Sequence, residues 1–279
     1  MTRAAAVIVT HDSQRWIEST LRSVLAQSRP ADEIVVIDDH STDGTLGIIA
    51  ETLGESVRCE AALSTAPDRL TRIAQNFEQG VRACSDVDVA LLGDHDDVWH
   101  PERVAHQVAL LERHPTMAMV ASDGLLVDAD GEQVGGSLRA VFPVAEGFNE
   151  MSPADQMRTV LRRSVATGGA SAVRPSAFSD VMIPPGWLHD RWWSLVATAR
   201  EAMLVDDALV IDYRVTQEQE IGLDLGQQGQ STVRRLTGSM AHASGTVAKL
   251  RDITRLLSPL ATPQTAPELA GRRLLRNLL

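Results

Sequence analysis

Three carboxylates fall within four residues in the segment Asp94-His95-Asp96-Asp97. This acidic segment follows an apolar run at residues 87–92, whose length is typical of a buried strand. Such a strand carries the residues after it to one edge of a sheet, and carboxylates crowded there repel one another unless a cation lies among them. Oxygen ligands of this kind suit Mg²⁺ or Mn²⁺. The segment therefore predicts a divalent metal site at the carboxyl end of a strand, where open α/β sheets bind ligands.

A second apolar run, Glu33–Asp39, also ends in paired carboxylates, Asp38 and Asp39. Because parallel strands end at the same edge of a sheet, we expect this pair and the acidic segment to face one crevice. The alternative is local, because carboxylates in either place also cap the helix that follows. For Asp38 both interpretations stay open.

The elements that must position these groups alternate along the first 130 residues, and this alternation predicts an α/β fold with a mostly parallel, doubly wound sheet. Segment 167–173 is small and flexible in composition and is expected on the substrate side. From about residue 225 the composition shifts, and helices broken by prolines are expected up to residue 279. The strands are expected at 4–10, 33–39, 57–63, 87–92, 117–127 and 208–213, and the helices at 13–30 with Ser13 as N-cap, 45–54, 73–83, 101–114, 153–163 and up to Arg200.

Composition limits the function classes. The chain has 279 residues with 44% hydrophobic content, enough for one large domain with a helical appendage. Its formal net charge of −11 argues against binding to nucleic acid. Cys59 and Cys84 form no metal-ligand motif and are expected to be reduced, buried thiols of a cytoplasmic protein. We find no apolar run of transmembrane length and no signal peptide.

Four stretches in this order resemble one known family. They are the opening helix around Leu21–Ser28, the segment Glu33–Thr45, the segment Asp94–Trp99, and His189–Trp193. Together they are similar to the inverting GT-A glycosyltransferases of family 2, and the Val-Trp after the acidic segment is common in rhamnosyltransferase-like members. The resemblance implies a GT-A catalytic domain at 1–222, with a nucleotide-sugar half at about 1–130 and an acceptor half at about 131–222. A helical extension would occupy 223–279.

The resemblance also implies roles in binding the donor. Asp96 and Asp97 would hold Mg²⁺ or Mn²⁺, which stabilises the charge on a leaving diphosphate, and Asp94 would contact the ribose or a metal-bound water. Asp39 would accept the imide N–H of uracil or thymine. The other donor contacts implied are Thr10, His11, Arg69 and Arg72, with solvation as the alternative for the two arginines.

The resemblance assigns Asp190 as the catalytic base. An inverting displacement needs a carboxylate opposite the leaving group, to take the proton of the acceptor hydroxyl; the alternative, a helix N-cap, is compatible with that role. Trp187, His189 and Trp192 are candidate acceptor contacts, because indole faces stack on sugars. A place in the core is the open alternative for the tryptophans, and a supporting role for His189.

The sequence departs from the family pattern at both ends of the match. His11-Asp12 replaces the usual Tyr-Asn, so His11 would have to stack on the base. Thr216 and Gln219 replace a later His and Asn, which leaves the closing loop and donor preference open. The QxxRW motif of processive synthases is absent, which favours transfer of a single sugar.

The expected function is therefore transfer of one sugar from a UDP- or dTDP-sugar to a hydroxyl acceptor, namely a glycan, a lipid-linked intermediate or a small natural product. A sugar-1-phosphate nucleotidyltransferase is one alternative, but the Gly-rich basic loop that it needs after the first strand is missing. A non-catalytic nucleotide-binding protein of the same fold is another. The Arg- and Leu-rich C-terminus fits packing on the catalytic domain, a homodimer or peripheral contact with the inner face of a membrane.

Overall fold

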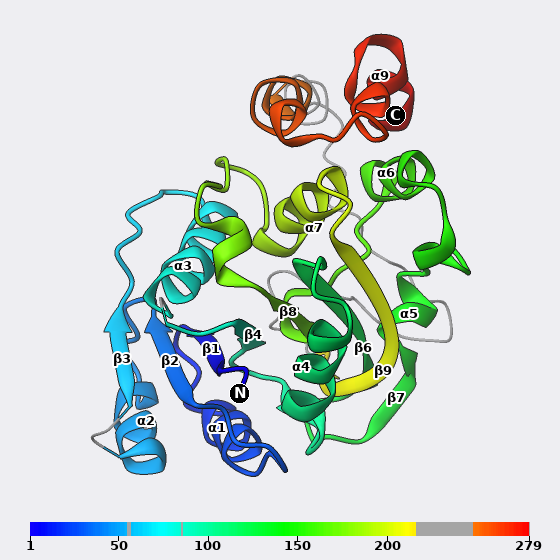
Figure 1. The fold of residues 1–279 in the computed structure, drawn as a ribbon. Coiled ribbons are helices and arrows are strands. Elements are labelled where there is room, and N and C mark those ends of the chain that lie inside the picture. Colours follow the sequence, from blue (N-terminus) through cyan, green and yellow to red (C-terminus); the bar gives the residue numbers. More distant parts are fainter. Residues whose placement is uncertain (55–56, 85, 216–247, 279) are drawn as a thin grey trace.

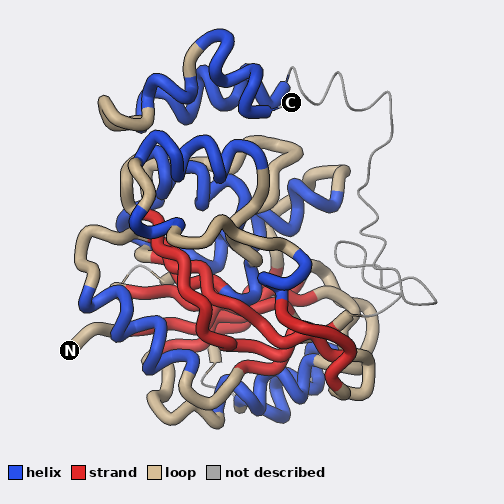
Figure 2. Tube along the Cα trace, turned by 90° about the vertical axis from the view of Figure 1, so that its right-hand side faces the viewer, coloured by secondary structure: helices blue, strands red, loops and turns tan. Residues whose placement is uncertain are grey.

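The computed structural model describes residues 1–54, 57–84, 86–215 and 248–278. Its central sheet has the strand order β3-β2-β1-β4-β8-β6-β9-β5, with β7 paired to β6, and helices lie on both faces (Figures 1 and 2). The strands are β1 (Ala4–Thr10), β2 (Glu33–Asp38), β3 (Arg58–Ala61), β4 (Val89–Asp94), β5 (Val98–Trp99), β6 (Met119–Val127), β7 (Gln133–Ser137), β8 (Ser171–Val173) and β9 (Met203–Arg214). The principal helices are α1 (Ile17–Leu25), α2 (Thr45–Leu53), α3 (Arg69–Ala83), α4 (Arg103–Arg113), α5 (Leu138–Val141), α6 (Pro153–Arg162), α7 (His189–Ala199) and α9 (Gly271–Leu278).

The core lies on both faces of the sheet, as the continuous apolar strands predict. Strand β1 divides between them, because successive side chains of a strand point to opposite faces. Ala4, Ala6 and Ile8 pack in the cluster that contains residues of α1, α2 and α4. Ala5, Val7 and Val9 pack in the cluster that contains residues of α3, α6 and α7.

The sheet is parallel where the sequence predicts it and mixed beyond β4. Strands β3, β2, β1 and β4 are parallel, and so are β6 and β9. Strand β8 runs antiparallel between β4 and β6. Residues 168–173 were expected to be flexible, and this was wrong, because Gly168–Ala170 form a buried 3₁₀ turn and β8 is a fully buried strand. Small side chains in this segment reflect close packing inside the sheet.

Two helices begin at other residues than predicted, and capping explains both. Helix α1 begins at Ile17 instead of Ser13, because the Ser13 hydroxyl bonds to the Thr10 hydroxyl and caps nothing. Helix α3 begins at Arg69, four residues earlier than expected. Asp68 is its N-cap, and its Oδ1 accepts the Thr71 N–H at 2.9 Å.

The described C-terminal residues pack next to α6 and α7 (Figure 1). Glu268 is buried and accepts hydrogen bonds from Arg158, at 2.9 Å, and from Asn277, at 3.0 Å. Within residues 1–54, 57–84, 86–215 and 248–278, no helix has the length and apolarity needed to cross a bilayer. Cys84 is buried as expected, but Cys59 is exposed, because β3 is an edge strand.

Candidate active site

The ends of three parallel strands form one wall of the site. Thr10 at the end of β1 lies beside Asp38 at the end of β2, and Val9 lies beside Asp94 at the end of β4. The convergence that the sequence predicted therefore follows from the register of the strands. Thr10 itself is buried, and its hydroxyl contacts Ser13 and does not face the crevice.

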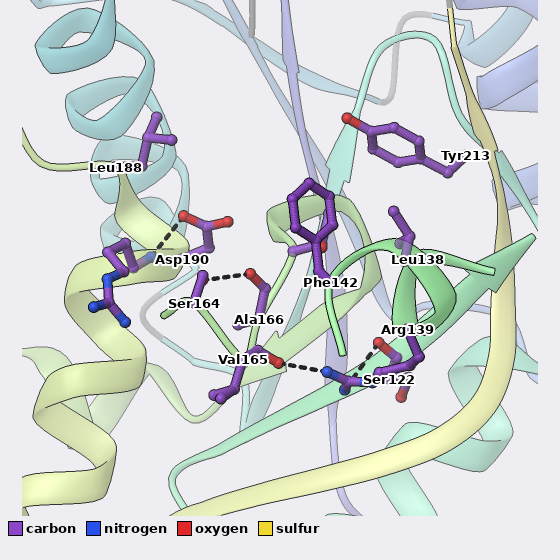
Figure 3. A pocket seen from close by; sticks show the side chains of 12 residues that line it. Ser122, Leu138, Arg139, Phe142, Ser164, Val165, Ala166, Leu188, Asp190 and Tyr213 are labelled. Atoms are coloured by element: carbon purple, nitrogen blue, oxygen red, sulfur yellow. Dashed lines mark hydrogen bonds between the residues drawn. The ribbon is translucent and has the colours of Figure 1, made fainter. Parts of the chain in front are cut away.

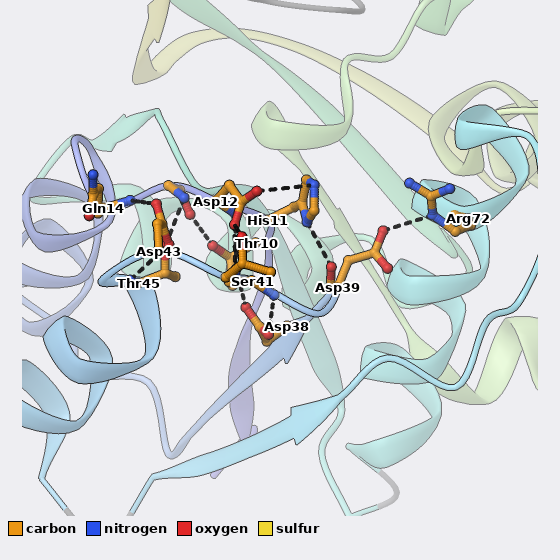
Figure 4. A network of polar contacts seen from close by, with 12 residues as sticks. Thr10, His11, Asp12, Gln14, Asp38, Asp39, Ser41, Asp43, Thr45 and Arg72 are labelled. Carbon is orange, nitrogen blue, oxygen red and sulfur yellow. Dashed lines mark hydrogen bonds and ion pairs between the residues drawn. The ribbon is translucent and has the colours of Figure 1, made fainter.

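Asp39 lies at the centre of a polar network at this wall (Figure 4). Its carboxylate accepts the Arg72 Nε–H at 3.1 Å, and its backbone carbonyl lies 2.7 Å from His11 Nδ1. Two residues that the sequence assigned to donor binding, His11 and Arg72, thus meet at a third. Arg69 begins α3, one helical turn before Arg72, and is partly buried.

Asp38 has a local role. Its two oxygens accept the backbone N–H of Ser41 at 2.9 Å and the Ser41 hydroxyl at 2.6 Å. Both bonds close the turn that leads to α2 (Figure 4). Of the two interpretations that the sequence left open, the structure favours the capping turn for Asp38.

The acidic segment places two carboxylate oxygens close to one point. A Cβ atom built on Gly169 would lie 2.5 Å from Asp97 Oδ2 and 3.0 Å from Asp94 Oδ2. Asp97 is 0% exposed, its Oδ1 accepts the Arg214 N–H at 3.1 Å, and its Oδ2 accepts no hydrogen bond. Only a residue without a side chain fits at position 169, between the two carboxylates.

Burial and mutual repulsion disfavour the ionised carboxylates. Burial, Asp96 and Asp190 together raise the pKa of Asp94 to about 7, and the backbone N–H of Gly169 offsets part of this. Burial, then Asp96 and Asp94, raise the pKa of Asp97 well above its ordinary value. Added positive charge would relieve this repulsion.

The three aspartates do not form a protein-only cage for a metal. Among the residues that the structure describes, no group of three or more His, Cys, Asp and Glu side chains is arranged to hold an ion. The sequence assigned Asp96 and Asp97 to the metal and Asp94 to the ribose or a metal-bound water, and these assignments stay predictions. The unpaired Asp97 Oδ2 and the neighbouring Asp94 Oδ2 nevertheless fit Mg²⁺ or Mn²⁺, which need only one or two carboxylates when phosphates supply other ligands.

Sequence analysis missed Arg103, the cation beneath the acidic segment. It is 1% exposed, stacks on the Trp99 ring at 3.8 Å, and donates from Nη2 to the Leu92 carbonyl at 2.6 Å. Its charge favours ionised Asp94 and Asp97, while burial lowers its own pKa to about 9. An arginine within ten residues of three carboxylates is a sequence pattern from which this cation could have been predicted.

Asp190 faces this wall from the other layer. It is the second residue of α7, and its Oδ1 accepts the N–H of Arg191 at 2.6 Å. Burial raises its pKa to about 6, although the Arg191 N–H and guanidinium and the Gly168 N–H lower it. Its charge in turn contributes to the raised pKa of Asp94, so the two carboxylates lie near each other.

Arg191 holds the start of α7 in place. Its guanidinium donates to the carbonyls of Leu161 at 2.8 Å and Arg163 at 2.6 Å, and also to that of Val160. These are the last carbonyls of α6, which lack partners inside their own helix. The arginine thus joins two helix ends and fixes the position of Asp190.

The predicted acceptor contacts lie in the core. Trp187 is 4% exposed and Trp192 1% exposed, and the Trp187 Nε1–H donates to Asp252 at 3.0 Å. His189 is buried against Phe77, with ring centroids 3.8 Å apart, and burial lowers its pKa to about 3. None of the three presents an open face to a ligand, so the structure favours core and supporting roles, the alternatives that the sequence left open. Thr216 and Gln219 lie outside the described residues.

Comparisons with known proteins agree with this geometry. Residues 5–133 match the family model described as Glycosyl transferase family 2. The putative glycosyltransferase EpsE of Bacillus subtilis (strain 168) is 27% identical over 130 residues, which are 46% of this chain and 45% of that protein. An uncharacterized glycosyltransferase of Nostoc sp. is 29% identical over 117 residues, which are 39% of this chain and 33% of that protein. The matches thus span less than half the length of these curated relatives.

Solved structures show the same fold. TarS of S. aureus in complex with UDP-GlcNAc has a TM-score of 0.64 and 17% identity, over 99% of this chain and 72% of that chain. Glucosyl-3-phosphoglycerate synthase of Mycobacterium tuberculosis, with Mn²⁺, UDP and its product, has a TM-score of 0.53 and 16% identity, over 77% of this chain and 73% of that chain. The fold is therefore GT-A, and residues 5–133 of the chain match the model of glycosyltransferase family 2.

Proposed function

We propose that this protein transfers one sugar from a UDP- or dTDP-sugar to a hydroxyl acceptor, with inversion at the anomeric carbon. One observation supports the proposal: Asp94, at the end of β4, and Asp190, at the start of α7, accept hydrogen bonds from the adjacent backbone N–H groups of Gly169 and Gly168, and Asp97 lies three residues after Asp94. A single displacement needs this arrangement, with a leaving-group site on one side of the sugar and a base on the other.

The donor would lie along the strand ends. Asp39, held by Arg72, would accept the imide N–H of the base, and His11 would lie against its ring. Arg72 and Arg69 begin α3, where the helix N-terminus favours anions. Two proteins of similar fold support a nucleotide-sugar donor and a divalent ion. They are glucosyl-3-phosphoglycerate synthase with Mn²⁺ and UDP, and the mannosyltransferase PcManGT of Pyrobaculum calidifontis with GDP-Man and Mn²⁺.

Asp97 and Asp94 would hold the metal ion, with Asp96 nearby as a further carboxylate. A bound Mg²⁺ or Mn²⁺ supplies positive charge that stabilises the departing nucleoside diphosphate. Arg103, buried below, supports the ionised state of both carboxylates when the donor is absent. Gly169 keeps the space between them open.

Asp190 would take the proton from the acceptor hydroxyl. A base with a pKa near 6 is ionised at neutral pH and still accepts a proton better than an ordinary carboxylate. The Arg191 N–H bound to Oδ1 fixes the carboxylate.

The test uses Asp190→Asn with Asp130→Asn, in an exposed turn, as matched control. Nucleotide sugars are first screened by thermal shift, with and without Mn²⁺. Metal-dependent stabilisation by UDP or dTDP identifies the nucleotide base of the donor. We expect Asp190→Asn to lose transfer by roughly a thousandfold or more while it binds UDP or dTDP like the wild type. Near-normal turnover in Asp190→Asn would refute the base assignment, and absence of metal-dependent nucleotide binding would refute the proposed function itself.

A further inference from the structure

A cavity of about 300 Å³ opens beside Asp190. Figure 3 shows the Asp190 carboxylate on one side of it and the rings of Phe142 and Tyr213 on the other. Leu138 and Leu188 complete an apolar wall. All of these residues lie beyond residue 133, where the family match ends. We name this cavity the acceptor pocket; of the residues that line it, only Ser122 lies within the matched residues 5–133.

The pocket adjoins the donor wall. Tyr213, the chain's single tyrosine, lies in β9 and lines the pocket. Burial, and after it the charges of Asp97, Asp94, Asp96 and Asp190, raise the pKa of Tyr213 well above its ordinary value. The tyrosine therefore lies within electrostatic reach of both the acidic segment and Asp190. A ligand in the pocket would present its nearest hydroxyl to Asp190.

We propose that the acceptor pocket binds a neutral acceptor whose reacting hydroxyl is flanked by an aromatic or aliphatic group. This inference rests on the proposed function and specifies its acceptor class. The apolar group would lie against Phe142, Leu138 and Leu188, which lose water-exposed area when it binds.

The charged side chains around the pocket argue against an anionic acceptor. Arg139 donates to the carbonyls of Val165 and Ala121, both at 2.8 Å, and Arg191 donates to the end of α6. Both guanidinium forks are thus bound to backbone carbonyls, so neither is set to grip a phosphate. The carboxylate of Asp190, which lines the pocket, would repel an anion.

Phe142 is the side chain that can be tested with least damage. It is 39% exposed, so truncation leaves no cavity in the core. Phe142→Ala removes the ring, and Phe142→Leu keeps an apolar surface. Leu256→Ala is the matched control, because Leu256 is 41% exposed and lies in the C-terminal segment.

The experiment measures ligand binding and needs no known acceptor. Saturation-transfer NMR with UDP and Mn²⁺ present compares p-nitrophenyl glycosides, methyl glycosides and hexose 6-phosphates of the same sugars. We expect the aryl glycosides to bind about tenfold more tightly than the methyl glycosides, and the phosphates to bind no better than the methyl glycosides. Phe142→Ala should abolish the aryl preference, whereas Phe142→Leu and Leu256→Ala should keep most of it.

Three outcomes would overturn the pocket proposal. They are tighter binding of a hexose phosphate than of the aryl glycoside, no aryl preference in the wild type, and an aryl preference that stays unchanged in Phe142→Ala. Thermal shift with UDP and Mn²⁺ on the same samples separates this failure from failure of the proposed function. Normal nucleotide binding without aryl preference rejects the acceptor class alone.

Discussion

The strand ends carry a connected set of polar groups, whereas the acceptor pocket is walled mainly by apolar side chains. At the strand ends, His11, Asp39 and Arg72 are bonded in series, and Asp38 closes its own turn. At the pocket, Leu138, Phe142 and Leu188 face the cavity, with Asp190 as the charged group that the mechanism uses. The polar groups at the strand ends have fixed hydrogen-bond partners without a ligand, whereas the pocket presents apolar surface against which a ligand can pack.

This difference matches what each side would have to recognise. A nucleotide diphosphate presents the same hydrogen-bonding groups whichever sugar it carries, and preorganised polar groups suit it. Acceptors vary in shape, and apolar walls discriminate among them through buried area. The pocket segments can therefore change in sequence without disturbing the register of β1, β2 and β4.

After loss of the Asp190 base, the largest expected effect comes from filling the space between the donor-side carboxylates. In Gly169→Ala the new methyl would lie 2.5 Å from Asp97 Oδ2, and Asp97 has little room to move because it is fully buried and held by the Arg214 N–H. Displacing a positioning carboxylate by about 1 Å costs roughly 100-fold. We expect kcat/KM to fall by about that factor in a transfer assay with a saturating metal concentration.

Gly47→Ala is the control for this variant. Gly47 lies in α2 with nothing within 4 Å of a new Cβ. This substitution should leave kcat/KM unchanged and raise stability by about 0.5–1 kcal/mol, because alanine favours a helix interior. Normal activity in Gly169→Ala would show that the spacing of Asp94 and Asp97 does not matter.

The two sides also differ in how far sequence predicted them. The strand ends were predictable because apolar runs ending in Asp39 and Asp94 are local patterns, and parallel pairing brings them together whatever the details of packing. The pairing of Arg72 with Asp39 was not predicted, because it joins residues 33 positions apart. The sequence nevertheless predicts that both residues contact the nucleotide-sugar donor.

The pocket side was beyond sequence reasoning for a physical reason. Its walls come from five separate segments, at residue 122 and around residues 138–142, 164–167, 188–191 and 213, which only the tertiary fold brings together. The aromatic residues could not be assigned to the acceptor site from sequence, because an indole that packs in the core and one that stacks on a sugar have the same local pattern. Gly168 and Gly169 were interpreted as flexible, although they are tight contacts to His189 and the two carboxylates.

The next effect is a pH dependence that originates on the pocket side. Because burial raises the pKa of Asp190 to about 6, its base form is complete above that pH and is lost as the pH falls through it. With donor, metal and acceptor saturating, kcat should fall about tenfold for each pH unit below 6. Rate measurements between pH 4.5 and 8 test this.

Saturating donor matters in that experiment, because Asp94 has a raised pKa too and its protonation would weaken donor binding. That effect appears in the KM for the donor and leaves kcat unaffected. A kcat that stays level from pH 7 down to pH 5 would contradict a buried Asp190 base. A decline confined to donor KM would move the titrating group to the strand ends.

The smallest effect on catalysis is expected at Trp187, which sequence assigned to acceptor binding and the structure buries. Trp187→Phe removes the N–H that binds Asp252 at 3.0 Å and leaves that buried carboxylate oxygen without its donor. The cost is about 1–3 kcal/mol, or several °C in Tm. Transfer kinetics should stay within about twofold of the wild type.

Trp193→Phe is the matched comparison, because Trp193 is equally buried but its Nε1–H has no hydrogen-bond partner. Both variants lose similar buried area, so the additional fall in Tm of Trp187→Phe isolates the bond to Asp252. A tenfold rise in acceptor KM with unchanged Tm in Trp187→Phe would instead return this indole to the acceptor site. In that case Trp187 would have to leave the core when the acceptor binds, and the wall of the pocket would extend from Leu188 back to Trp187, before the start of α7.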